Sequence, residues 1–157
     1  HFDDNGTLVG ALHPDLKAED ISQKHLLRQG DILFASKGTK IFATEFDSIN
    51  QPAVASTSFF VIRLNEGLSE TILPGYLVCY LNNPTTQTLL KSKAIGTSLV
   101  SISKSVLDEL DIPIPDVSKQ QAILNIARLR TKEKELQSQI SKLKDKQIQQ
   151  LIFKFIS

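Results

Sequence analysis

The sequence predicts an α+β fold in which a small mixed α/β domain is followed by one long C-terminal helix. The domain covers residues 1–117, where short apolar runs alternate with glycine, proline and polar turn residues. The helix covers residues 118–157, because neither glycine nor proline occurs after Pro115. The segment Ile112-Pro113-Ile114-Pro115 forms the junction and must be extended, since each proline disfavours helix in the residue before it.

The composition is that of an ordinary globular protein. With 157 residues and a hydrophobic fraction of 41%, the chain is long enough for one domain with a real core. No run approaches the roughly 18 apolar residues of a membrane span, so we expect no membrane partner. The start lacks a secretory signal and an initiator methionine, which indicates a trimmed fragment. The single cysteine, Cys79, favours a reducing cytoplasm.

Charge is distributed unevenly along the chain. Residues 1–117 carry nine Lys/Arg and fourteen Asp/Glu, a balance of −5, whereas residues 118–157 carry nine Lys/Arg and three Asp/Glu, a balance of +6. The domain is therefore not broadly basic, and any nucleic-acid surface on it must be local. Two segments are candidates. Residues 21–44 hold four Lys/Arg against one acid, and residues 71–106 hold three lysines and no acid.

Short strands are predicted in the first half of the domain. A turn at Gly30-Asp31 precedes a buried strand over residues 32–36. Residues 37–40 then form an exposed loop, and residues 41–43 form the returning strand. Residues 58–64, which are rich in β-branched and aromatic side chains, form the next strand.

Helices are predicted in the second half. Residues 72–81 form a helix with a proline in its first turn, and residues 85–93 form another, which Gly96 ends. A short strand over residues 99–102 precedes a helical turn over residues 105–110, with a serine cap and acids in its first turn. The aromatic side chains interpreted as core are Phe59, Phe60, Tyr76 and Tyr80.

The C-terminal helix carries an apolar stripe with spacings of three and four residues. Beyond Leu143 the stripe shifts by one position, which favours straight helix packing over a long supercoil. About 40 residues at 1.5 Å per residue give a length of roughly 60 Å. Such a helix is not stable alone, so its partner must come from another copy, another subunit or another part of the same polypeptide. The predicted helix-pairing residues are Ile126, Leu129, Leu136, Ile140, Leu143, Ile148 and Leu151.

No catalytic residue, metal site or cofactor site is predicted. His1, His13 and His25 lack metal-ligand spacing, and Cys79 lies among apolar residues, where an inert thiol is expected. The isolated glycines form neither a phosphate loop nor a dinucleotide fingerprint. The acids over residues 108–111 are better explained by helix capping and a solvated face than by a metal.

Taken in order and spacing, several motifs resemble the specificity subunit of type I restriction-modification systems. The family's full subunit usually contains two recognition domains and two spacer helices, whereas this chain has one of each. The family usually has Glu before the glutamine that corresponds to Gln121, where this chain has Gln120. The motifs are Gly30-Asp31-Ile32-Leu33 with Gly38-Thr39, residues 56–63, Tyr76-Leu77 with Tyr80-Leu81-Asn82, Gly96-Thr97, Ile112-Pro113-Ile114-Pro115 and Gln120-Gln121.

The resemblance implies sequence-specific recognition of double-stranded DNA without catalysis. Each recognition domain of the family reads one half of a split target. The paired helices fix the gap between the halves and dock the methyltransferase (modification) subunits, with the restriction subunit as a further partner. As a half-subunit, this chain is expected to form a homodimer with antiparallel helices, or to pair with a second half-subunit.

Two loops and one separate cation are the candidate DNA contacts. Residues 37–40 offer close backbone approach at a glycine and lysine contacts, although an ordinary solvated hairpin explains them too. The residues around Gly96 offer lysines and small hydroxyl donors, with a cation-rich helix end as the alternative. The predicted DNA-binding residues are Arg28, Lys37, Gly38, Thr39, Lys40, Lys91, Lys93, Thr97 and Ser98.

A second function class stays open at this point. The chain can be a protein-interaction module, with a globular head on a dimerising helix that never touches DNA. The balance of −5 on residues 1–117 favours this alternative, because DNA is a polyanion.

Overall fold

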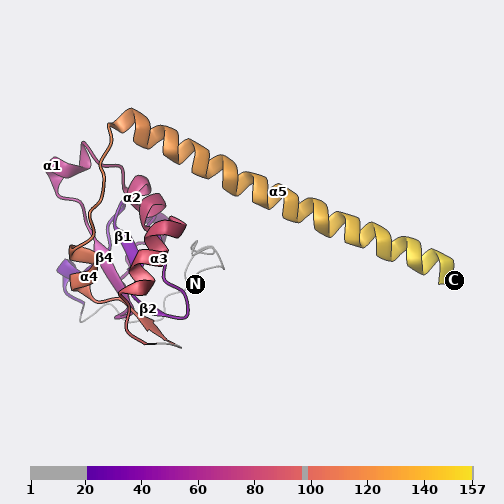
Figure 1. The fold of residues 1–157 in the computed structure, drawn as a ribbon, viewed down its shortest axis with the longest axis horizontal. Coiled ribbons are helices and arrows are strands. Elements are labelled where there is room, and N and C mark those ends of the chain that lie inside the picture. The colour runs from indigo at the N-terminus through magenta and orange to yellow at the C-terminus, as the bar shows by residue number, and fades with distance from the viewer. Residues whose placement is uncertain (1–20, 97–98, 157) are drawn as a thin grey trace. The chain divides into compact units, whose positions relative to one another are not determined.

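The structure, a computed structural model, describes residues 21–96 and 99–156 (Figure 1). The chain divides into two compact units, His1–Gln121 and Ala122–Ser157, which we call the globular unit and the helical unit. Strands and short helices make up the globular unit, and a long helix extends through the helical unit. The predicted α+β class with a long C-terminal helix is therefore confirmed.

A three-stranded antiparallel sheet lies at the centre of the globular unit. Strand β1 (Ile32–Ala35) is the middle strand, with β3 (Ala43–Glu45) on one side and β4 (Phe59–Ile62) on the other. All four residues of β1 are buried, as expected for a continuous apolar run in a sheet that is covered on both faces. The strands predicted over residues 32–36 and 58–64 are confirmed.

A separate two-stranded ribbon is formed by β2 (Lys37–Gly38) and β5 (Val100–Ser101). Its strands are antiparallel, with Lys37 opposite Ser101 and Gly38 opposite Val100. The backbone N–H of Ile102 donates to the carbonyl oxygen of Ser36 at 2.8 Å, which joins the ribbon to the end of β1.

This ribbon corrects the expectation for the segment after β1. Residues 37–40 were expected to be an exposed loop, but the first two of them are a paired strand. The returning strand begins at Ala43 and not at Ile41. The reason is a long-range partner: β5 lies far along the chain, and a two-residue strand has no periodicity that could reveal it.

In the described part of the globular unit, four short α-helices accompany the strands: α1 (Glu66–Ser69), α2 (Pro74–Leu81), α3 (Pro84–Ser92) and α4 (Lys104–Asp108). Proline begins both α2 and α3, where its missing N–H breaks no helical hydrogen bond. The side chain of Asn83 caps α3 by accepting from the N–H of Thr85 at 2.9 Å. The helices predicted over residues 72–81 and 85–93 are confirmed.

Helix α4 differs from its prediction in one respect. Its serine cap is present, because Ser103 Oγ accepts from the N–H of Val106 at 3.4 Å. The acids, however, lie at the end of the helix and not in its first turn. Asp108 is the last helical residue, and Glu109, which follows it, forms an ion pair with Lys93 at 3.3 Å. These acids therefore do not stabilise the N-terminal end of the helix dipole.

The larger apolar cluster joins one face of the sheet to α2 and α3, which lie beside it in Figure 1. Ile32 and Phe34 of β1 are in this cluster, whereas Leu33 is in a smaller cluster on the opposite face, as the alternation of a strand requires. Phe60 packs against the larger cluster and Phe59 against the smaller one. The buried members of the larger cluster are Ile32, Phe34, Ile41, Ala43, Ile72, Tyr76, Leu77, Leu81, Leu90 and Ile102.

Three polar side chains, Asp31, Asn82 and Gln120, hold separate segments together, and we call them the clamp residues. Asp31 is 1% exposed, and its Oδ2 accepts from the N–H of Arg28 at 2.7 Å. Both of its oxygens accept from Arg63, Oδ1 from Nε and Oδ2 from Nη2, each at 2.6 Å. These bonds raise the pKa of Arg63 and join the turn before β1 to the end of β4.

The other two clamp residues use carboxamide groups. Asn82, at the end of α2, accepts from the N–H of Ala43 at 2.8 Å and donates to its carbonyl oxygen at 2.7 Å. Gln120 is fully buried, and its Oε1 accepts from the N–H of Leu73 at 2.9 Å. Its Nε2 donates to the carbonyl oxygens of Thr71 and Pro115, at 2.8 and 2.7 Å. Every hydrogen-bonding atom of that carboxamide is therefore used.

Helix α5 (Val117–Ile156) begins in the globular unit and continues through the helical unit. Asp116 caps its first turn, because Oδ1 accepts from the N–H of Lys119 at 2.9 Å and from Ser118 Oγ at 2.6 Å. These bonds hold the pKa of Asp116 well below its usual range. The segment before α5 is neither helical nor part of a strand, and it accepts hydrogen bonds from the hydroxyl of Tyr76 at Pro113 and from that of Tyr80 at Asp111.

Candidate nucleic-acid interface

The β2–β5 ribbon brings together two of the predicted DNA-binding segments. Lys91 lies in the last turn of helix α3, and Lys93 follows the helix two residues before Ile95. The backbone groups of Ile95 and Ser101 exchange two hydrogen bonds, at 3.0 and 2.9 Å, and Ser101 is also opposite Lys37 in the ribbon. We call this surface the ribbon edge, and it consists of residues 37–40, Lys91, Lys93, Ile95, Gly96 and Leu99.

Gly96 is necessary for the turn at the ribbon edge. Its φ of +97° lies in the region that favours glycine. A Cβ atom at this position would also lie 2.4 Å from the carbonyl oxygen of Leu99, which is far inside van der Waals contact. The turn between Ile95 and Ser101 therefore requires glycine for two independent reasons. Gly38 in β2 also has a positive φ, of +144°.

The predicted cations of the ribbon edge differ in their surroundings. Lys37, Lys40 and Lys91 have exposed side chains. Lys93 is also exposed, but its ion pair with Glu109 neutralises part of its charge. Thr39 is exposed next to these lysines, whereas Thr97 and Ser98 lie outside the described residues. The ribbon edge is thus a small cationic surface on a unit whose overall charge is negative.

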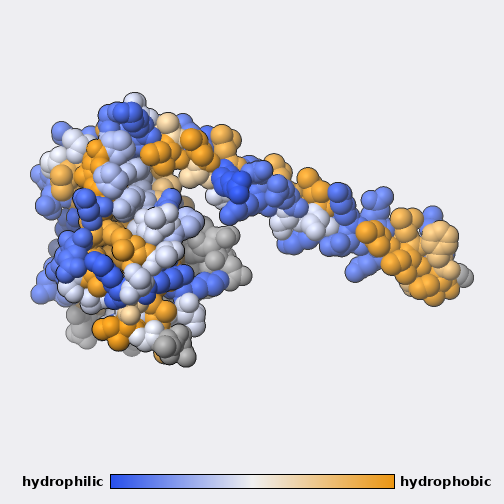
Figure 2. Space-filling view, in the orientation of Figure 1, coloured by the Kyte–Doolittle hydropathy of each residue, from blue (hydrophilic) through white to orange (hydrophobic). Residues whose placement is uncertain are grey.

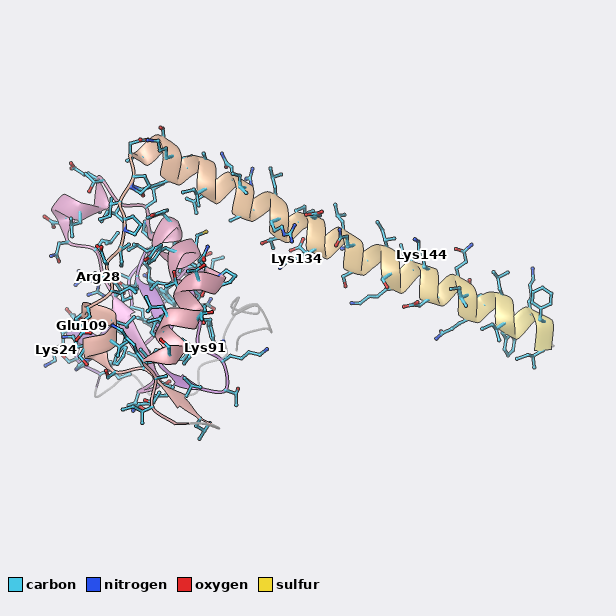
Figure 3. All side chains as sticks on the ribbon, viewed as in Figure 1. Lys24, Arg28, Lys91, Glu109, Lys134 and Lys144 are labelled. Atoms are coloured by element: carbon cyan, nitrogen blue, oxygen red, sulfur yellow. The ribbon has the colours of Figure 1, made fainter. Side chains whose placement is uncertain are left out.

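Arg28 does not belong to this surface. It lies in the turn before β1, whereas Lys37 follows the other end of β1, so the strand separates them. Figure 3 also shows Arg28 and Lys91 at opposite sides of the globular unit. Arg28 and the loop over residues 37–40 belong to the same basic segment of the sequence, residues 21–44, but the length of β1 lies between them.

Two apolar residues of the ribbon edge were not among the sequence predictions. Ile95 is 75% exposed and Leu99 is 67% exposed, on the two sides of the turn that contains Gly96. Figure 2 shows apolar surface at this end of the globular unit. The sequence offered little signal for their exposure, because Val100 and Ile102 follow Leu99 and make this stretch resemble a buried strand.

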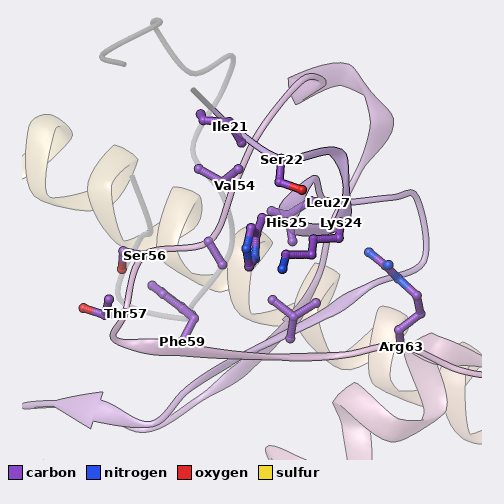
Figure 4. Close-up of a pocket in the computed structure, with 12 residues that line it drawn as sticks. Ile21, Ser22, Lys24, His25, Leu27, Val54, Ser56, Thr57, Phe59 and Arg63 are labelled. Atoms are coloured by element: carbon purple, nitrogen blue, oxygen red, sulfur yellow. The ribbon is translucent and has the colours of Figure 1, made fainter. Parts of the chain in front are cut away.

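A groove of about 870 Å³ lies against the face of the sheet that carries the smaller apolar cluster (Figure 4). Lys24 and Arg63 supply its cationic groups, and His25 also lines it. The guanidinium of Arg63 is already bonded to Asp31, so it is not available to a ligand in the way that a free arginine is. The described residues that line the groove include none of the predicted DNA-binding residues.

Metal and thiol chemistry receive no support from the described part of the chain. Over residues 21–96 and 99–156, no group of three or more His, Cys, Asp or Glu side chains is placed to hold a metal ion. Cys79 is half-buried in α2, and burial raises the pKa of its thiol, which makes the thiolate less available. The acids at 108–111 that suggested a metal include Glu109, which is paired with Lys93.

The helical unit exposes the whole apolar stripe that the sequence predicts. Its side chains are between 46% and 67% exposed, and Figure 2 shows apolar surface at intervals along the helix. Ion pairs between Arg130 and Glu133 and between Lys132 and Glu135 lie on this helix. The helix-pairing residues in this stripe are Ile126, Leu129, Leu136, Ile140, Leu143, Ile148 and Leu151.

These features define the chain as a small α+β domain that is continued by a long helix and exposes a cationic ribbon. The family model described as the type I restriction modification DNA specificity domain matches residues 15–142. The match covers most of the chain, so the chain belongs to this family. At the level of the family, its function is DNA sequence recognition in type I restriction-modification.

No curated protein matches the chain. Among its described helices, none has the length and apolar character that a membrane crossing requires.

Proposed function

We propose that the chain reads one half of a bipartite target in double-stranded DNA through its ribbon edge. It acts as the non-catalytic specificity component of a cytoplasmic type I restriction-modification complex. The observation that supports this most strongly is the pairing of β2 with β5. That pairing joins Lys37 and Gly38 to Val100 and Ser101, and Ser101 also pairs with Ile95, which follows Lys91 and Lys93 in the chain.

The geometry and charge of the ribbon edge suit a DNA groove. A two-stranded ribbon fits the major groove, which is about 12 Å wide. Lysines beside such a ribbon bind phosphates and orient it, while groups on the turn reach the base edges. Lys37 and Lys91 supply exposed cations here, and residues 71–106 contain no acid that would repel the phosphates.

The helical unit supplies the pairing surface in this proposal. Its exposed apolar stripe is covered by the same stripe of a second copy, in antiparallel orientation, or by the helix of a second half-subunit. Two paired helices then carry two recognition domains, one for each half of the target. The cationic side chains on the rest of the helix, such as Lys142 and Lys144, form a docking surface for the methyltransferase subunit.

DNA binding by the 157-residue chain tests the recognition proposal. We expect the affinity for duplex DNA to fall steeply as salt rises, with or without the methyltransferase subunit. The double variant Lys37→Ala/Lys40→Ala should bind more weakly. It should also reduce the slope of log affinity against log salt by about 2, because each lost phosphate contact removes about one unit. Fluorescence anisotropy at several salt concentrations measures both quantities.

A matched control uses two lysines of the helical unit. Lys142→Ala/Lys144→Ala removes the same charge and should leave the affinity of the chain alone for DNA close to that of the unchanged protein. If the two double variants lose affinity equally, net charge explains the binding and the ribbon edge is not the site. If no DNA binding occurs even with the methyltransferase subunit, the protein-interaction module is the better explanation.

Light scattering tests the pairing of the helical unit. The chain has a mass of 17.4 kDa, so a homodimer has twice this mass. Leu136→Asp/Ile140→Asp places charges within the apolar stripe and should return the protein to the mass of one chain. A single-chain mass for the unchanged protein at high concentration contradicts the homodimer and leaves pairing with a second half-subunit.

A further inference from the structure

Ile95 and Leu99 are large apolar side chains that the core of the globular unit does not use. They are 75% and 67% exposed, although water is an unfavourable environment for such side chains. Ile95 exchanges two backbone hydrogen bonds with Ser101, and Gly96 next to it adopts a φ of +97°. Two large apolar groups are thus exposed beside a hydrogen-bonded part of the ribbon, outside the core.

The surroundings of this apolar pair indicate what covers it. Lys37 lies in the strand opposite Ser101, and Lys91 and Lys93 precede Ile95 along the chain. A partner that accepts this surface must therefore combine negative charge with apolar groups, within reach of a narrow two-stranded ribbon. Duplex DNA meets these conditions in its major groove, where the phosphates flank the base edges and thymine exposes a 5-methyl group.

We propose that Ile95 and Leu99 are specificity-determining residues that contact thymine 5-methyl groups in the major groove. This inference rests on the proposed function, because it requires that the ribbon edge faces DNA. The methyl group distinguishes a T·A pair from the other pairs through apolar contact alone. The lysines of the ribbon edge contribute affinity for any sequence, whereas the apolar pair contributes preference for particular thymines.

The widths of the two DNA grooves favour the major groove as the binding site of the ribbon. The minor groove is about 6 Å wide, which is too narrow for a two-stranded ribbon, and it presents no methyl group. Apolar side chains that enter the minor groove act instead as wedges that unstack the bases and bend the duplex. Contact with thymine methyl groups and wedging therefore predict different responses to a change in the thymine base.

The experiment replaces thymine by uracil in the preferred duplex, which the unchanged 157-residue chain selects from random sequences. Uracil lacks only the 5-methyl group, so no variant protein is needed for the first measurement. We expect uracil at one or two positions to weaken binding by about fourfold each, the effect of one lost buried methyl group. Ile95→Ser/Leu99→Ser should weaken binding to the thymine duplex and lose the difference between thymine and uracil.

Ile49→Ser is the matched control, because Ile49 is 74% exposed but lies on the 3-10 turn η3 (Ser48–Asn50), which follows β3 and does not belong to the ribbon. This variant should keep the full response to uracil. Circular dichroism confirms that the variants keep their fold. A response to uracil that persists in Ile95→Ser/Leu99→Ser, or that is absent from the unchanged chain, overturns the inference.

The outcomes separate this inference from the proposed function. If the unchanged chain binds DNA in a salt-dependent and sequence-specific way but does not respond to uracil, the proposed function stands and only the methyl contact is wrong. If Ile95→Ser/Leu99→Ser loses affinity equally for all sequences, the apolar pair does not determine specificity, and the inference is wrong. If the unchanged chain binds no duplex under any salt condition, both proposals fail.

Discussion

The clamp residues and the ribbon edge are two parts of one globular unit that use their side chains in opposite ways. Asp31 and Gln120 are buried, and each bonds to several groups of other segments. The ribbon edge is held by backbone hydrogen bonds, and its large side chains are exposed. The difference predicts that substitutions of side chains at the ribbon edge cost little stability, whereas substitutions of the clamp residues lower the free energy of unfolding markedly.

The clamp residues also lie in the motifs that carry the resemblance to the family. Asp31 belongs to the Gly30-Asp31-Ile32-Leu33 motif, Asn82 ends the Tyr80-Leu81-Asn82 motif, and Gln120 is in Gln120-Gln121. Each of these side chains makes structural hydrogen bonds in this chain. Motifs of this kind therefore identify the scaffold of a recognition domain more directly than they identify the surface that reads DNA.

The largest expected effect comes from Asp31→Asn. The substitution keeps the volume but removes the negative charge and turns an NH₂ group toward the donors that the carboxylate accepts from. We expect a loss of about 2–3 kcal/mol in the free energy of unfolding, below the loss for a fully buried pair because water reaches the Arg63 side chain, which is 36% exposed. Urea denaturation measures this change.

Lys37→Ala supplies the comparison for Asp31→Asn. Its side chain is exposed, so the free energy of unfolding should change by less than about 0.5 kcal/mol. Equal losses for the two substitutions would remove the contrast between the clamp residues and the ribbon edge.

A smaller effect is expected for Gln120→Ala. The truncation leaves the N–H of Leu73 and the carbonyl oxygens of Thr71 and Pro115 without their partner, which costs about 2 kcal/mol. Hydrogen exchange at the N–H of Leu73 should become faster, because its acceptor is lost. The exposed neighbour Gln121→Ala is the control and should leave this exchange unchanged. Unaltered exchange in Gln120→Ala would show that the clamp contributes little.

The smallest expected effect concerns Asp116 and depends on pH. Hydrogen bonds from Ser118 and Lys119 lower the pKa of Asp116 in the folded chain. Its stabilising contribution is therefore complete above the pKa of the unfolded chain, about 4, and is lost as pH falls below that value. Asp116→Asn should be slightly less stable than the unchanged protein at pH 7, and the difference should shrink at pH 3. Urea denaturation at both pH values measures it, and a difference that grows on acidification contradicts the assignment.

The sequence predicted the parts of the fold that have local causes. The continuous apolar run over residues 32–35 predicted β1, and Pro74 and Pro84 stand in the first turns of the two helices that were expected. The long C-terminal helix followed from the absence of glycine and proline after Pro115. In each case, the residues that predict the element all lie within the element or directly beside it.

The ribbon was not predictable in this way, because its strands have two residues each and their partners lie far apart in the sequence. For the same reason, the candidate site was predicted as two unconnected loops and a separate cation, Arg28. The exposure of Ile95 and Leu99 was also hidden, since aliphatic residues near a predicted strand are ordinarily buried. The ribbon, the connection between the two loops and the surroundings of Ile95 and Leu99 all depend on pairing between segments that lie apart in the sequence.

The carboxamide of Asn82 has one further consequence. Ala43 lies in β3, the outer strand of its sheet, and its N–H and carbonyl oxygen point away from β1, because Phe42 and Phe46 make the bonds to the central strand. A free strand edge of this kind recruits strands of other molecules and promotes aggregation. By occupying both groups of Ala43, Asn82 closes the middle of that edge to strands of other molecules, so a side chain at the end of a helix protects the sheet from edge-to-edge association.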